Sequence, residues 1–226
     1  GQAVSSLGSN VSITAYPLLV LALTGSAASA GLVGFLGSLP YALLQLPAGA
    51  YVDRWDRRRV MLVSDAIRSV TLAVVTIAVL ADRAPLPLLA AAAFVEGSLS
   101  VVFMAADSGS IRHVVHPSQL TAAMAQNEAR IRGAAFVGRP LGGALFGIGQ
   151  SIPFLLDACT YAISFLTLSR VRANFNDERT GERQHLIAEI KEGIVWLWRQ
   201  PFLRACVLLV AGSNFMFPAL SLTVVV

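Results

Sequence analysis

The chain has few charged side chains and only two cysteines. Charged residues make up 13% of its 226 residues and hydrophobic residues 55%, whereas about 25% of residues are charged in ordinary soluble domains. Cys159 and Cys206 lie in separate apolar stretches without metal-ligand spacing, so we interpret both as packing residues. So little charge disfavours a soluble domain and predicts a chain embedded in a membrane.

Catalytic and nucleic-acid-binding patterns are also missing from the sequence. It contains no glycine-rich nucleotide loop, no Ser-His-Asp arrangement and no paired catalytic carboxylates. His113 and His116 are three residues apart but have no third ligand, which disfavours a metal site. Basic residues do not alternate with aromatic residues, so the net charge of +4 does not indicate a nucleic-acid surface. We therefore expect no enzyme activity, cofactor, metal or nucleic-acid partner.

Long apolar segments dominate what is present. A helix needs roughly 20 mostly apolar residues to cross about 30 Å of hydrocarbon, and most of these segments reach that length. They predict an all-α fold, a polytopic bundle of membrane helices. The seven segments are 4–23, 29–52, 60–80, 86–106, 122–149, 152–168 and 202–226.

Basic residues are concentrated on one side of the predicted bundle. Of the 17 Lys and Arg residues, only Arg83 lies in a loop on the other side. The positive-inside rule therefore predicts that the basic loops and the start of the chain face the cytoplasm. The basic loops are 53–59, 107–121 and 169–201, and the loops of the other side are 24–28, 81–85 and 150–151.

One dense charge cluster, residues 49–59, separates the second and third segments. It reads Gly-Ala-Tyr-Val-Asp-Arg-Trp-Asp-Arg-Arg-Arg. Asp53 sits at the end of a predicted helix, where its carboxylate can accept charge-assisted hydrogen bonds from guanidinium groups and neighbouring helix N-termini. Such bonds would lock one state of the cytoplasmic face; a topology anchor with incidental ion pairs is the alternative. The candidate gating residues are Gly49, Asp53, Arg54, Arg57 and Arg58.

The order of residues in this cluster resembles the signature between the second and third helices of the major facilitator superfamily, although Asp56 stands where glycine is common. Its Trp-Asp-Arg-Arg-Arg ending resembles a subgroup of bacterial efflux carriers that includes macrolide and siderophore exporters. Residues 17–26 and 127–130 are similar to parts of the first and fifth helices of that subgroup. Residues 138–143 are similar to a Gly-Pro…Gly-Gly element associated with proton-coupled export, with Arg139 where proline is common. The candidate helix-packing residues of this element are Gly138, Pro140, Gly142 and Gly143.

The resemblance implies the six-helix N-terminal half of a facilitator fold over residues 1–169. A cytoplasmic linker with an amphipathic helix follows over 170–201, and the start of a second bundle over 202–226. Since both ends lie in apolar runs, we expect a fragment that lacks its C-terminal half.

The function implied is secondary active export of small amphipathic molecules or drugs across the bacterial cytoplasmic membrane. The expected partners are the small-molecule cargo, protons or another coupling ion, the lipid bilayer and the missing half. A non-transporting scaffold or sensor that retains the fold is the alternative.

Two charged residues fall deep in the predicted helices. Glu96 lies near the middle of the fourth segment and Arg139 near the middle of the fifth. An ionisable group at that depth costs about 2.5–3.5 kcal/mol, so it normally faces a cavity or a partner. We predict that Glu96 carries protons and that Arg139 tunes it if the two pair. The alternative is a structural ion pair between the two helices.

Other polar residues in the apolar segments are weaker candidates. Asn10, Tyr16 and Gln45 could line the cargo path or simply bond a neighbouring helix. Asp157 lies about a turn into the sixth segment. We predict a snorkelling or capping role for it near the outer surface, with a functional site as the alternative.

Overall fold

The structure, a computed structural model, describes residues 2–52, 54–114, 116–170 and 195–209. It divides the chain into two compact units, Gly1–Thr180 and Gly181–Val226. The division into three segments that the sequence suggests, with boundaries after residues 169 and 201, stays a prediction.

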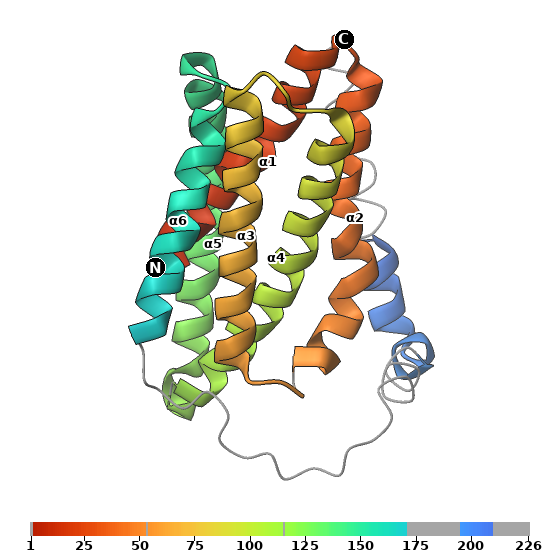
Figure 1. Cartoon of the computed structure of the whole chain (residues 1–226). Helices are drawn as coiled ribbons and strands as arrows, with labels where there is room; N and C mark the ends of the chain where they lie inside the picture. The colour runs from red at the N-terminus through yellow and green to blue at the C-terminus, as the bar shows by residue number, and fades with distance from the viewer. Residues whose placement is uncertain (1, 53, 115, 171–194, 210–226) are drawn as a thin grey trace. The chain divides into compact units, whose positions relative to one another are not determined.

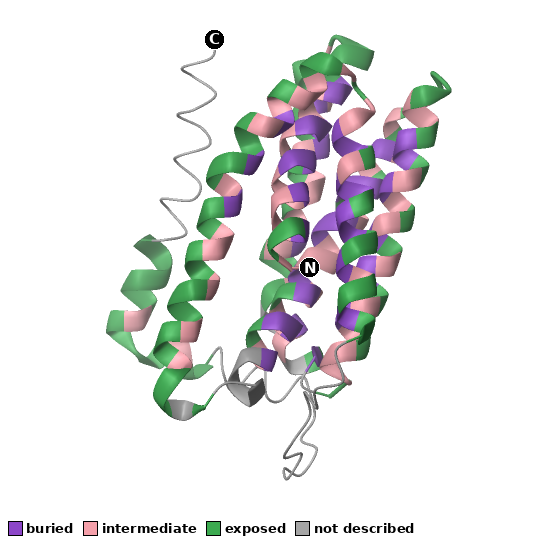
Figure 2. Cartoon of the chain, turned by 90° about the vertical axis from the view of Figure 1, so that its left-hand side faces the viewer, coloured by how far each residue is buried: buried purple, intermediate pink, exposed green. Residues whose placement is uncertain are grey.

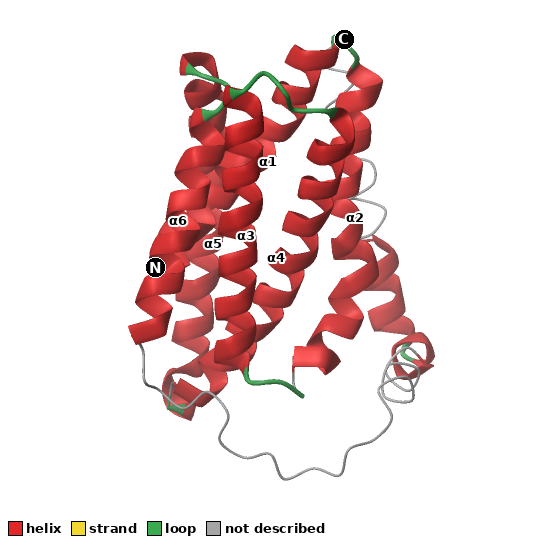
Figure 3. Ribbon diagram, in the orientation of Figure 1, coloured by secondary structure: helices red, strands yellow, loops and turns green. Residues whose placement is uncertain are grey.

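Every regular element that the structure describes is helical (Figure 3). No strand occurs in the described ranges, and this agrees with the predicted all-α membrane bundle. The helices of the first unit are α1 (Gln2–Thr24), α2 (Ala27–Val52), α3 (Arg57–Leu80), α4 (Leu86–Val114), the short 3-10 helix η1 (Pro117–Gln119), α5 (Leu120–Ile148) and α6 (Ile152–Arg170).

Two helix ends show how local sequence sets the boundaries. Asp56 is the N-cap of α3, and its side chain accepts a hydrogen bond from the backbone N–H of Arg59 at 3.1 Å. This cap lets α3 begin before the predicted start at residue 60. Gly25 ends α1 with φ of +65°, a left-handed conformation that glycine adopts without strain.

The loop predicted at 107–121 is shorter in the structure. The helix α4 continues to residue 114, and Ser110 Oγ donates a 2.7 Å hydrogen bond to the carbonyl of Ala106 within it. Asp107, expected in the loop, is buried inside the bundle instead.

Five described helices are long and apolar enough to cross a membrane. Although α5 was also predicted to span, it does not reach that level of apolarity. Its charged residues, among them Arg132 and Arg139, and its glycines lower its hydropathy. Of the seventh predicted span, only residues up to 209 are described. The five spans are Gln2–Thr24, Ala27–Gln45, Arg57–Leu80, Leu86–Ser110 and Ile152–Arg170.

The six long helices of the first unit run side by side (Figure 1). The helix α2 packs against α4, α3 packs against α4 and α6, and α1 packs against α2, α5 and α6. Buried positions gather where helices face one another (Figure 2). At the α2–α4 contact, a side chain on Gly97 would collide with the backbone of Gly37, so glycine lets these helices approach closely.

A polar layer separates the two apolar clusters of the first unit. Along α3, Asp65 and Arg68 lie between Met61 of one cluster and Leu72 of the other. Along α4, Glu96 occupies the same kind of position. The packing of apolar side chains on both sides therefore holds several ionisable groups inside the bundle.

In the second unit, the described residues form helical stretches at 195–199 and 201–209. Across the break, the backbone N–H of Gln200 donates to Leu197 and that of Arg204 donates to Gln200, at 3.1 and 3.0 Å. Most of the predicted linker, including the start of its amphipathic helix, lies outside the described residues.

Candidate functional site

The site is centred on an ion pair between α3 and α4. Arg68 Nε donates to Glu96 Oε2 at 3.2 Å. Both residues are buried, with 4% and 9% of their surface exposed. At 1.5 Å per residue, Arg68 lies about 17 Å along α3 and Glu96 about 15 Å along α4. The pair is therefore deep inside both helices.

Two further helices contribute to this pair. Arg68 Nη2 donates to Ser9 Oγ of α1 at 3.3 Å, and Ser9 Oγ shares a 2.8 Å hydrogen bond with the Tyr161 hydroxyl of α6. The Tyr161 hydroxyl also donates to Glu96 Oε2 at 3.4 Å, and the guanidinium lies 4.0 Å from the centre of the Tyr161 ring. These four residues, Ser9, Arg68, Glu96 and Tyr161, form the central network, which joins α1, α3, α4 and α6.

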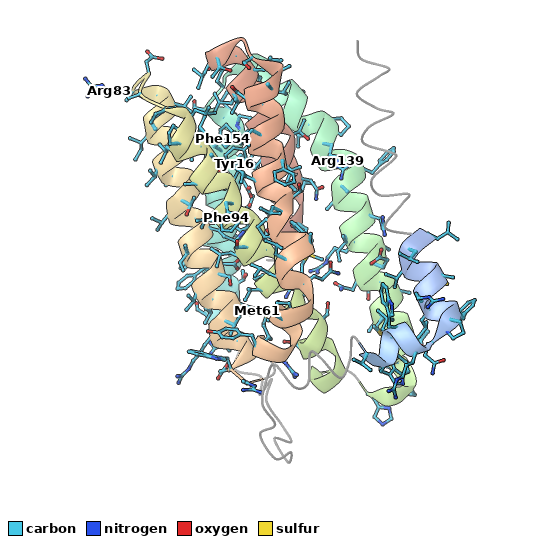
Figure 4. All side chains as sticks on the ribbon, turned by 90° about the vertical axis from the view of Figure 1, so that its right-hand side faces the viewer. Tyr16, Met61, Arg83, Phe94, Arg139 and Phe154 are labelled. Carbon is cyan, nitrogen blue, oxygen red and sulfur yellow. The ribbon has the colours of Figure 1, made fainter. Side chains whose placement is uncertain are left out.

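The ion pair corrects the hypothesis that Glu96 pairs with Arg139. Arg139 is exposed on α5, well apart from the labelled interior residues in Figure 4. The pair therefore joins α3 to α4, not α4 to α5. The sequence reasoning overlooked Arg68 because it assigned that residue to the start of a membrane segment. Arg68 and Glu96 carry opposite charges in two consecutive apolar segments, and this pattern could have predicted that they pair.

Several buried oxygens near the central network are unsatisfied. Among the described residues, Glu96 Oε1 and both carboxylate oxygens of Asp65 have no partner in hydrogen-bonding geometry, although Ser164 of α6 interacts with the Asp65 carboxyl group. Asp65 is fully buried on α3, three residues before Arg68. A carboxylate oxygen without a donor gains a hydrogen-bonding role when it binds a proton, because a carboxylic acid is itself a donor. The arrangement is chemically suited to bind and release protons.

The three polar candidates for the cargo path lie in different environments. Tyr16 is buried, with its ring 5.0 Å from that of Phe154 in an edge-to-face contact (Figure 4). Asn10 is half-buried, donates to a backbone carbonyl of its own helix and lies against Gly138. Gln45 is exposed on α2. Tyr16 and Asn10 thus have packing roles, and contact with cargo stays a prediction for all three.

Two arginines of the charge cluster bond other helices of the same unit. Arg57 Nη1 donates to the carbonyl of Gly109 in α4 at 3.4 Å. Arg58 donates to the carbonyls of Leu168 and Ser169, the latter at 2.6 Å, so its positive charge caps the C-terminal end of α6. Both contacts fix the start of α3 within the bundle.

The remaining candidate gating residues are Gly49, Asp53 and Arg54. Asp53 lies outside the described residues. A side chain on Gly49 would meet open space, and Arg54 is exposed. The gating role of the cluster therefore stays a prediction.

A second polar network, which we call the basic-end network, joins α1, α4 and α5. Arg130 Nη2 donates to Asp107 Oδ2 at 2.9 Å and to Asn127 Oδ1 at 2.7 Å. Arg130 Nη1 donates to Gln2 Oε1 at 2.8 Å, and Gln2 Nε2 donates to Asp107 Oδ1 at 2.6 Å. Sequence reasoning missed this network because it assigned Asp107 to a loop.

The glycines of the fifth helix divide between two faces. A Cβ on Gly142 would lie 2.6 Å from the carbonyl oxygen of Val11, and Gly138 is equally close to α1. These two glycines, four residues apart, let α1 and α5 approach each other. By contrast, Gly143 faces open space and Pro140 is exposed, so the described structure gives no packing contact for Gly143.

Asp157 does not have the snorkelling or capping role that the sequence predicted. Its side chain is fully buried in α6, so it neither snorkels nor caps the helix. Because α1 packs against α6, a neighbouring helix covers it.

Comparison with known proteins identifies the family. The Major Facilitator Superfamily profile matches residues 1–226. The chain is 30% identical over 219 residues to the multidrug efflux pump Tap of Mycolicibacterium fortuitum, an alignment that covers 92% of this chain and 54% of that protein. It is 26% identical over 220 residues to macrolide efflux protein A of Streptococcus pyogenes, covering 96% of this chain and 54% of that protein. The chain spans about half the length of these curated relatives. It belongs to the major facilitator superfamily.

Proposed function

We propose that this chain is part of a secondary active transporter that exports small amphipathic molecules, including antibiotics, in exchange for protons. Family membership supports transport, and the relatives are named for multidrug and macrolide efflux. The one-sided distribution of arginines supports a cytoplasmic position for the N-terminus and for the charge cluster. The proposal places the protein in the bacterial cytoplasmic membrane.

The central network is the observation that supports proton coupling. A proton on Glu96 would remove the charge that holds Arg68 and weaken the link between α3 and α4. Since Ser9 and Tyr161 bond the same pair, the change reaches α1 and α6 as well. Protonation would thus alter the relative stability of two packing arrangements, as ion-coupled transport requires.

The substitution Glu96→Gln in the full-length protein tests this assignment. Glutamine keeps the approximate shape of the side chain but cannot titrate, so we expect pH-driven export to be abolished while some cargo binding remains. The measurement is cargo flux in reconstituted vesicles under an imposed pH gradient. Glu128→Gln is the matched control, because Glu128 forms an exposed ion pair with Arg132 at 2.7 Å.

A full pH response in Glu96→Gln would show that Glu96 is structural and that another group couples transport to protons. Absence of cargo flux in the unmodified protein, under any ion gradient, would favour the alternative of a non-transporting scaffold or sensor.

The proposal also assigns a gating role to Asp53 at the cytoplasmic face. Asp53→Asn keeps the size of the side chain and removes the charge that receives charge-assisted hydrogen bonds. We expect slower export with normal membrane insertion, measured as cargo flux normalised to expression. Normal flux at normal expression would reduce the cluster to a topology anchor.

A further inference from the structure

Asp157 is a buried carboxyl group outside the central network. It lies on α6 with no exposed surface. The neighbouring helix α1 carries glycine at position 8, and a Cβ there would collide with Asp157 Oδ1 and Thr160 Oγ1. The missing side chain of Gly8 therefore makes room for the carboxyl group between the two helices.

The Asp157 carboxyl group accepts few hydrogen bonds for a group that is fully buried. Oδ1 accepts one hydrogen bond, at 3.0 Å, from the hydroxyl of Thr160 on the same helix. Oδ2 has no partner among the described residues. Ser12, one turn beyond Gly8 on α1, interacts with the carboxyl group, yet Ser12 Oγ also has no partner in hydrogen-bonding geometry within the described chain. The α1–α6 contact thus contains two buried oxygens, Ser12 Oγ and Asp157 Oδ2, that have no hydrogen-bond partner among the described residues.

No basic side chain among the described residues forms an ion pair with Asp157. Arg68 of α3, the only arginine buried there, donates to Glu96 and Ser9. Its charge attracts Asp157 from a distance, but Glu96 of α4 repels Asp157. Tyr16 of α1 and Tyr161 of α6 are the other titratable groups that interact with Asp157.

The charged residues of α5 do not compensate Asp157 either. Arg130 is bonded in the basic-end network, and Glu128 and Arg132 pair with each other. Arg139 is exposed. Of the four buried carboxyl groups of the described bundle, Asp107 pairs with Arg130, which leaves Asp65, Glu96 and Asp157 with one buried arginine.

A buried carboxylate that lacks a cation and a full set of donors is strongly disfavoured, and such a group takes up a proton instead. We infer that Asp157 is a second proton-binding site of the bundle, separate from the Arg68–Glu96 pair, and that it holds its proton at neutral pH. A proton makes the carboxyl group a donor, and Ser12 Oγ, which interacts with this group, is an acceptor without a partner among the described residues.

Infrared spectroscopy of the reconstituted full-length protein tests the inference. A protonated carboxyl group has a carbonyl stretching band that an ionised carboxylate lacks. At neutral pH we expect Asp157→Asn to lose the intensity of one protonated carboxyl group relative to the unmodified protein. Asp107→Asn is the matched control, because Asp107 is ion-paired with Arg130 at 2.9 Å, and it should lose only carboxylate intensity. Loss of carboxylate intensity in Asp157→Asn would overturn the inference.

A second measurement covers the case in which Asp157→Asn does not fold. Aspartate labelled with carbon-13 at the side-chain carboxyl shifts every aspartic acid band in the unmodified protein. A shifted band of protonated aspartate supports the inference, and its absence overturns it without any substitution. Asp157→Ser, which is smaller, then assigns the band among the aspartates. Neither readout requires transport, so this inference can fail while the proposed export stands, and the reverse also holds.

Discussion

The central network and the basic-end network are both built around an arginine and a carboxylate, but they differ in how completely the carboxylate is bonded. Asp107 uses both oxygens, one with Arg130 and the other with Gln2. Glu96 accepts both of its hydrogen bonds at Oε2, and its other oxygen, Oε1, has no partner in the described chain. The first arrangement joins three helices through a carboxylate with both oxygens bonded, whereas the second leaves one carboxylate oxygen able to accept a further hydrogen bond or a proton.

The two networks also differ in their access to water. The side chain of Arg130 is 21% exposed, whereas that of Arg68 is 5% exposed. Loss of its carboxylate would let Arg130 turn toward solvent, but Arg68 would remain buried. The same substitution should therefore have a larger effect in the central network.

Arg68→Gln should produce the largest effect on stability. It leaves Glu96 buried without its cation, and breaking a buried ion pair in this way costs about 3–5 kcal/mol. The measurement is the free energy of unfolding of the full-length protein in mixed detergent. The double variant Arg68→Gln/Glu96→Gln removes both charges and should recover much of the loss. A double variant no more stable than Arg68→Gln would show that the charge pair is not the cause.

Asp107→Asn should have an intermediate effect. The amide still accepts one hydrogen bond but no longer balances Arg130, so we expect a loss of about 1–3 kcal/mol in the same unfolding measurement. Export should keep its pH response because the central network is intact. A changed pH profile with normal stability would contradict the distinction drawn between the two networks.

Asp56→Ala should have the smallest effect. It removes the hydrogen bond to the Arg59 N–H at the start of α3, and loss of an N-cap costs about 1 kcal/mol. Asp56→Ser retains a capping oxygen and should remain close to the unmodified protein in thermal stability. Equal losses for alanine and serine would indicate that the charge of Asp56, not its cap, stabilises this end of the helix.

Much of the fold could be predicted from residue order. Apolar runs and turn residues placed the loops at 24–28 and 81–85, close to the observed breaks between Thr24 and Ala27 and between Leu80 and Leu86. These signals are local, since a membrane helix satisfies its backbone hydrogen bonds within one segment. The charge cluster also carried the family resemblance that the profile match confirms.

The candidate site was only partly predictable. The depth of Glu96 could be counted along its segment, because a charge in an apolar run is visible without any tertiary information. The ionic partner of Glu96 was harder to predict: opposite charges in consecutive segments indicate Arg68, but sequence positions alone do not say whether Arg68 or Arg139 faces α4. The burial of Asp157 was missed for the same reason, since it depends on Gly8 in a distant helix.

The sequence by itself determined the six long helices of the first unit, their order and which loops carry the arginines, because hydropathy and charge act segment by segment. Only the tertiary structure decided which ionisable groups meet. Ser9 and Tyr161 bond each other across 152 residues of chain, and glycines such as Gly8 and Gly142 set how closely their helices approach. The partner of a buried charge depends on how helices rotate and pack against one another, and that is a property of pairs of segments rather than of one.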